Sequence, residues 1–96
     1  DNFIRQANYK QFMAYKQLTK LIREKIQRKE TIETKVLNLY EASNPSFYYV
    51  YEILGDYYAA IQQTDTAITY WQKALTMPIP KQAEKVRIQQ KINKKQ

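Results

Sequence analysis

Glu52 and Asp56 form the pair of side chains whose types and spacing could support chemistry in this chain. They are four positions apart in a stretch predicted to be helical, so both carboxylates would lie on one side of the helix. Paired carboxylates can act as general acid and general base when they face each other across a pocket. Two neighbours on one helix surface lack that opposed geometry, so their spacing argues against acid–base catalysis.

The composition excludes most other catalytic and metal-binding sites. The chain contains no His and no Cys, which removes imidazole catalysis, thiol chemistry and metal sites built from these ligands. It also contains no Gly-rich phosphate loop and no nucleophile–base motif. We therefore predict that the protein is not an enzyme and that it uses no catalytic residue, metal or cofactor.

The elements that carry Glu52 and Asp56 are predicted to be helices packed in one small domain. The 96 residues include one Gly and three Pro, which is too little turn chemistry for a sheet with many hairpins. Apolar and aromatic fractions of 44% and 14% indicate a folded core. We predict an all-α fold of about five helices, over residues 2–29, 31–42, 45–62, 65–76 and 81–94.

The starts of three helices are predicted from capping residues and from Pro45. Pro45 is expected in the first turn of the third helix, where its missing N–H is tolerated. The expected N-caps of the second, third and fourth helices are Thr31, Asn44 or Ser43, and Thr64 or Asp65.

Large and small residues recur at fixed offsets between residues 51 and 74, in the stretch YEILGDYYAAIQQTDTAITYWQKA. The signature positions are Tyr51, Leu54, Gly55, Tyr58, Ala67, Trp71 and Ala74. Their order resembles the W-x2-L-G-x2-Y, A-x3-F, A pattern of the tetratricopeptide repeat, with Tyr for the first Trp and Trp for the Phe. The resemblance covers residues 48–78, about a third of the chain. It implies a hairpin of two antiparallel helices in which these residues are structural, with Gly55 and Ala67 allowing close approach.

The flanking segments are predicted to complete this hairpin within a single domain, residues 1–96. Residues 1–43 would form an atypical helical pair, residues 45–77 the hairpin, and residues 80–96 a polar capping helix. Because a stable array usually needs at least three repeats, we expect the chain to be part of a larger protein or to associate with itself.

The resemblance also implies a function, because tetratricopeptide repeats hold other proteins on a concave face lined by the first helix of each repeat. Carried over by position, that face would contain Tyr49, Glu52, Ile53, Asp56 and Ala59. The partner would be a basic or tyrosine-contacting peptide, another protein, or another domain of the same chain. The alternative is that the two carboxylates are a solvated or salt-bridged pair, for which Lys16 or Lys20 of the first helix are the suggested cations.

Five tyrosines lie within residues 48–58. They point to all sides of one helix, and a helix that is apolar all round is usually covered on all sides. We therefore predict that this helix is the central one, with neighbours on both flanks.

Charge is segregated along the chain, whose formal net charge is +7. Residues 1–35 hold nine Lys or Arg and four acids, residues 36–72 hold four acids and no Lys or Arg, and residues 73–96 hold seven Lys or Arg and one acid. Basic ends interleaved with aromatic residues support an alternative function, nucleic-acid binding by the first and last helices. The candidate basic face consists of Arg5, Lys16, Lys20 and Arg23.

Other partners and the compartment are less constrained. The chain has no apolar run long enough to cross a bilayer, and we do not expect a membrane partner. No targeting segment is visible, which leaves the compartment unknown and slightly favours the cytoplasm.

Overall fold

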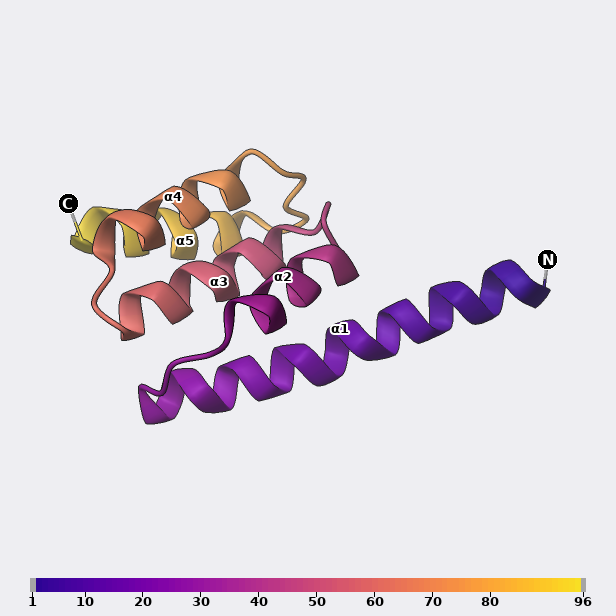
Figure 1. Ribbon diagram of the computed structural model, residues 1–96. Helices are drawn as coiled ribbons and strands as arrows, with labels where there is room; N and C mark the ends of the chain where they lie inside the picture. Colours follow the sequence, from indigo (N-terminus) through magenta and orange to yellow (C-terminus); the bar gives the residue numbers. More distant parts are fainter. Residues whose placement is uncertain (1, 96) are drawn as a thin grey trace.

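The computed structural model consists of five α-helices (Figure 1). It describes the backbone of residues 2–95 and the side chains of residues 9–95. The helices are α1 (Asn2–Arg28), α2 (Thr34–Ser43), α3 (Tyr48–Ala60), α4 (Thr64–Leu75) and α5 (Gln82–Lys95), and no strand occurs in residues 2–95. The predicted all-α fold of about five helices is confirmed.

Helix α3 is the centre of the molecule. It packs most extensively against α4 and also contacts α1 and α2, while α5 packs against α4. The second half of α1 lies beside α2 and α3, and its N-terminal turns project beyond the other helices (Figure 1). None of the helices in residues 2–95 is both long enough and apolar enough to cross a membrane.

The tyrosine-rich sequence of α3 is buried on almost every side. Its buried residues are Tyr48, Val50, Tyr51, Glu52, Ile53, Leu54, Gly55 and Tyr57. Such a helix needs neighbours all round to be stable in water. The prediction that this helix is central is therefore confirmed.

The seam between α3 and α4 depends on one large and one small residue. The indole of Trp71 occupies the space where a Cβ on Gly55 would stand, so the missing side chain lets the two helices approach closely. Ala67 and Ala74 of α4 are fully buried in the core. Farther along, Tyr58 is half-buried and stacks on Tyr70, with ring centroids 5.4 Å apart.

Helix α1 attaches through a narrower contact. The ring of Tyr15 stacks on Tyr40 of α2 at 5.8 Å, and the Thr19 hydroxyl donates a hydrogen bond to the Tyr40 hydroxyl at 2.8 Å. Ile22 is fully buried against the core. Earlier in the helix Tyr9 and Phe12 are exposed, and the Gln11 side-chain amide donates a hydrogen bond to the Ala42 carbonyl at 3.4 Å.

The predicted start of α2 is wrong by three residues. The helix begins at Thr34 rather than residue 31, and its N-cap is Glu33, which makes no side-chain capping bond. The Ile32 N–H donates to the Tyr57 hydroxyl at 2.9 Å, and the Ile32 side chain packs against the core. This long-range contact outweighs the local capping preference of Thr31.

The predicted start of α3 is also wrong by three residues. Asn44 is the C-cap of α2 and Ser43 its last residue, while Phe47 is the N-cap of α3. The Phe47 ring packs edge-on against Tyr15 and Tyr48, and this packing holds Phe47 in an extended conformation. Pro45 consequently lies in the turn before the helix.

The start of α4 carries no side-chain cap. Its N-cap is Gln63, which makes no side-chain capping bond, and the helix begins at Thr64. The predicted caps Thr64 and Asp65 are therefore wrong, because both residues lie inside the helix. The other helix ends lie within two residues of their predicted positions.

Two helices end with a residue in the left-handed conformation. Lys29 follows α1 with φ 56° and Gln62 follows α3 with φ 70°. In each case the next N–H reaches back five residues, from Glu30 to the Lys25 carbonyl and from Gln63 to the Tyr58 carbonyl. Both ends are Schellman motifs that satisfy terminal carbonyls without a glycine.

Candidate functional site

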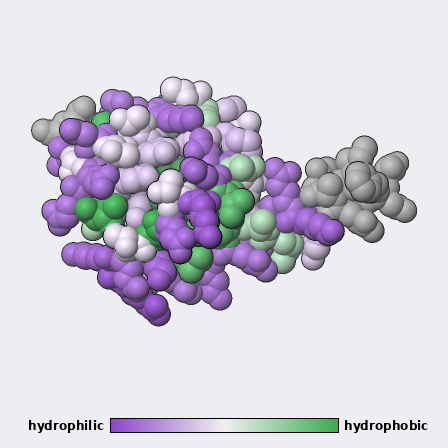
Figure 2. Space-filling view, viewed as in Figure 1, coloured by the Kyte–Doolittle hydropathy of each residue, from purple (hydrophilic) through white to green (hydrophobic). Residues whose placement is uncertain are grey.

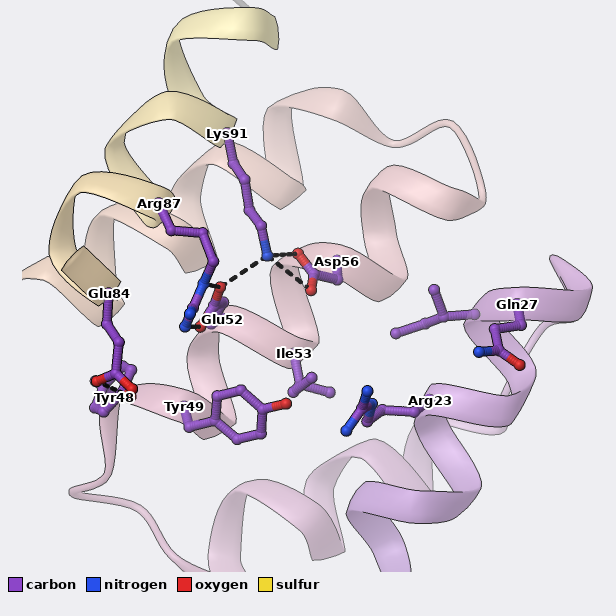
Figure 3. Close-up of a pocket in the computed structure, with 11 residues that line it drawn as sticks. Arg23, Gln27, Tyr48, Tyr49, Glu52, Ile53, Asp56, Glu84, Arg87 and Lys91 are labelled. Atoms are coloured by element: carbon purple, nitrogen blue, oxygen red, sulfur yellow. Dashed lines mark hydrogen bonds and ion pairs between the residues drawn. The ribbon is translucent and has the colours of Figure 1, made fainter.

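A groove of ≈ 420 Å³ runs between α1, α3 and α5 (Figure 3). These are alternate helices of the chain, and each contributes one side to the groove. Its lining consists of Arg23, Ile26, Gln27, Tyr48, Tyr49, Glu52, Ile53, Asp56, Glu84, Arg87 and Lys91. Four of the five residues assigned to the partner face are among them.

Glu52 lies on the α3 side of the groove with 1% of its surface exposed. Arg87 of α5 binds it bidentately, donating from Nε and Nη2 at 2.8 and 2.7 Å. Lys91 donates to the same carboxylate at 2.7 Å. A fork of two parallel charge-assisted bonds is the strongest common arrangement for a carboxylate in a protein.

Asp56 completes a network that joins three helices. Lys91 of α5 donates to its two oxygens at 3.0 and 3.1 Å, and the Trp71 indole of α4 donates at 3.1 Å. Figure 3 shows Arg87 and Lys91 reaching down from α5 to the two α3 carboxylates. We call Glu52, Asp56, Arg87 and Lys91 the ionic cluster.

The pKa shifts of the two carboxyl groups differ in direction. Burial alone would raise the pKa of Glu52, but hydrogen bonds from Arg87 and Lys91 outweigh burial and lower it. Burial raises the pKa of Asp56 even though Lys91 opposes the shift. The bond to Glu52 also raises the pKa of Arg87. Glu52 is therefore the better stabilised anion of the two.

Helix α5, rather than α1, provides the salt bridges to the two carboxylates. The alternative of a salt-bridged pair is therefore confirmed, but the suggested cations, Lys16 and Lys20, are wrong. Spacing alone could not have revealed the true partners. Arg87 and Lys91 are four residues apart, as are Glu52 and Asp56, but Lys16 and Lys20 of α1 have the same spacing. Two helices that pack side by side can match two such pairs.

A further hydrogen bond joins α3 to α5 within the groove lining. The Tyr48 hydroxyl donates to Glu84 at 2.6 Å. Burial and this bond raise the pKa of Tyr48 to about 12. The α5 side thus presents charged groups that already have partners.

The α1 side of the groove presents polar side chains that are exposed. Arg23 and Gln27 are exposed, and Arg23 has no ion-pair partner within 4.0 Å among the described side chains. Tyr49 is half-buried and Ile53 is buried between the two sides. In Figure 3 the Arg23 guanidinium points toward Tyr49 and Ile53.

The remaining predicted site residues lie outside the groove. Ala59 is half-buried and packs against the core. Lys16 and Lys20 are exposed on α1 and line an adjoining shallow hollow, of ≈ 300 Å³, together with Thr19, Arg23, Glu24 and Gln27. Arg5 lies outside the residues whose side chains are described. Figure 2 shows hydrophilic side chains over the second half of α1.

Both carboxylates of the ionic cluster already accept bonds from cations, and no group of three acidic side chains in the described part of the chain could hold a metal ion. Comparison with protein-family models, curated proteins and solved structures found no match. Function must therefore be argued from the groove itself.

Proposed function

We propose that this protein is a non-catalytic interaction module of the tetratricopeptide-repeat type, which holds a segment of another protein or a neighbouring domain in the groove. One observation carries the proposal: the groove is lined by α1, α3 and α5, the alternate helices of the chain. In a repeat array of helical hairpins these are the first helices of successive hairpins, and they line the concave face.

The chemistry of the groove supports binding of a polypeptide. It combines an aromatic ring, a branched aliphatic side chain and an exposed guanidinium, from Tyr49, Ile53 and Arg23. Aromatic residues and Arg are enriched in protein interfaces because they provide area and directional bonds together. The volume of ≈ 420 Å³ has room for a few side chains of a bound segment.

A steric block tests the proposal. Gln27 is exposed and lines the groove, whereas Gln17 is exposed on the same helix outside the groove lining. Gln27→Trp should fill the groove without changing charge, and Gln17→Trp is its matched control. We expect affinity capture with nuclease-treated lysate to lose specific proteins with Gln27→Trp and to retain them with Gln17→Trp. Equal capture by both variants contradicts the proposal.

Nucleic-acid binding is the second candidate function. The observation that favours it is a row of exposed cations on α1, Lys16, Lys20 and Arg23, beside the exposed ring of Phe12. Lys16 Nζ lies 5.5 Å from the centre of that ring. Under this hypothesis capture is lost on nuclease treatment, and affinity for an oligonucleotide falls steeply with salt concentration.

A further inference from the structure

We infer that the groove selects an acidic segment, whose carboxylate side chains contact Arg23 on the α1 side. The inference rests on the proposed function and specifies the partner chemistry of the same site. It reverses the prediction of a basic partner, which assumed that Glu52 and Asp56 are open.

The acids of the groove are already paired. Glu52 accepts three bonds from Arg87 and Lys91, and Asp56 accepts bonds from Lys91 and Trp71. A basic partner would have to displace cations held at 2.7–3.1 Å from buried or half-buried oxygens. Leaving such groups unpaired is costly, so the cluster does not attract a second cation.

Charge without a partner remains on the other side. Arg23 is exposed, faces the groove and has no ion pair among the described side chains. Lys16 and Lys20 extend the positive surface along α1, against one nearby acid, Glu24. A guanidinium can bind a carboxylate with two parallel bonds. Arg23 is therefore the position where a partner's carboxylate gains most.

The α5 side would repel a second carboxylate near Glu84, which accepts a hydrogen bond from the Tyr48 hydroxyl. It would tolerate a carboxylate near Arg87. Arg87 remains 44% exposed at its side chain and uses two of its five N–H donors on Glu52. An acidic segment would consequently lie with its first carboxylate on Arg23 and with apolar atoms over Tyr49 and Ile53.

The mixed character of the groove favours a polypeptide over a nucleic acid as the anionic partner. The lining holds three acids, Glu52, Asp56 and Glu84, and three cations, Arg23, Arg87 and Lys91, so it carries no net charge. A phosphate backbone carries a charge at every nucleotide and would find there one cation without an ion pair among the described side chains, Arg23. A peptide can place one carboxylate on Arg23 and neutral residues elsewhere.

The test uses three 12-residue peptide pools with acetylated and amidated ends, so that side chains are their sole charges. Each pool contains Leu, Phe, Gly and Ser with four positions set to Glu, Lys or Gln. Binding is followed by two-dimensional NMR of the labelled protein, which detects affinities into the millimolar range. The variants are Arg23→Glu and, as a control for charge reversal on the same helix, Lys10→Glu, since Lys10 is exposed outside the groove.

The expected result is that the Glu pool shifts the signals of Tyr49 and Ile53 and binds more tightly than the Gln and Lys pools. Arg23→Glu should weaken the Glu pool about five- to tenfold, because an exposed ion pair is replaced by repulsion. Lys10→Glu should change its affinity by less than about twofold.

Four results would overturn the inference. Tighter binding of the Lys pool than of the Glu pool would show that the groove selects a basic segment instead. Equal weakening by Arg23→Glu and Lys10→Glu shows general charge attraction instead of a site. If all pools bind equally and Gln27→Trp abolishes that binding, the proposed function stands but the acidic preference is removed. A single-stranded oligothymidylate that binds through Arg23 while no peptide pool binds overturns both proposals and favours nucleic acid.

Discussion

The two sides of α3 are built from similar basic helices but use them differently. On the α4/α5 side, Arg87 and Lys91 bind buried or half-buried carboxylates and Trp71 fills the space above Gly55. On the α1 side, Lys16, Lys20 and Arg23 face solvent or the groove, with no ion pair among the described residues. The difference shows that the number of charges on a helix does not tell whether they stabilise the fold or face solvent.

The largest expected effect is on the packed side. Trp71→Ala leaves a cavity above Gly55 and removes the indole bonds to Glu52 and Asp56, which should cost about 4 kcal/mol of unfolding free energy. Phe12→Ala, an exposed aromatic on α1, should cost less than about 0.5 kcal/mol. Urea denaturation followed by circular dichroism measures both, and equal losses would remove the distinction between the two sides.

The next largest effect on stability is expected from removing the cations of α5, compared with removing those of α1. Arg87→Met with Lys91→Met leaves the Glu52 carboxylate buried without a partner, at a cost of about 3 kcal/mol. That figure is the low end of the usual range because both cations are partly exposed. Lys16→Met with Lys20→Met should change stability by less than about 0.5 kcal/mol. A comparable loss in the α1 double variant would show that its cations are structural.

Acid should weaken the α5 side through Glu52. The pKa of Glu52 is lowered in the folded state. Its contribution to stability is therefore complete above its ordinary pKa of 4.5 and is lost as the pH falls below that value. Asp56 has a raised pKa, so its contribution has the opposite sign and partly offsets the loss. We expect Asp56→Asn to lose stability more steeply than wild type below pH about 4.5, and Glu52→Gln to lose it less steeply. The free energy of unfolding of each variant is measured against pH. Identical slopes for the two variants would contradict the opposite pKa shifts assigned to Glu52 and Asp56.

The smallest expected effect tests a feature common to both sides. Lys29→Gly and Gln62→Gly should each stabilise the protein by about 0.5 kcal/mol, since a left-handed conformation costs more for a side-chain-bearing residue than for glycine. Gln63 has φ −102°, so Gln63→Gly should give no gain. Thermal melts measure the three variants, and a gain for Gln63→Gly alone would reject the assignment.

The hairpin of α3 and α4 could be predicted because its signals are local. The offsets of Leu54, Gly55, Ala67 and Trp71 lie within one short stretch, and the structure buries all four on the seam or beside it. The starts of α2 and α3 could not be predicted, because Ile32 and Phe47 are held by contacts with Tyr57 and Tyr15, far away in sequence.

Four of the residues assigned to the partner face lie in one groove, but the prediction missed the cations that neutralise two of them. Tyr49, Glu52, Ile53 and Asp56 do line one groove, yet the cations that neutralise the acids come from residues 35 and 39 positions farther along the chain. Local periodicity carries no information about pairing over that distance. Charge segregation places basic residues at both ends of the chain, but it did not indicate which basic end would reach α3.

The placement of Trp71 has a practical consequence. It is the one tryptophan of the chain, it is 3% exposed, and its indole N–H is bonded to Asp56 of the ionic cluster. Its intrinsic fluorescence is therefore a built-in reporter of the joint between α3, α4 and α5, fed by energy transfer from the surrounding tyrosines. A red shift of the emission before helical structure is lost would show that α5 detaches while the hairpin of α3 and α4 remains folded.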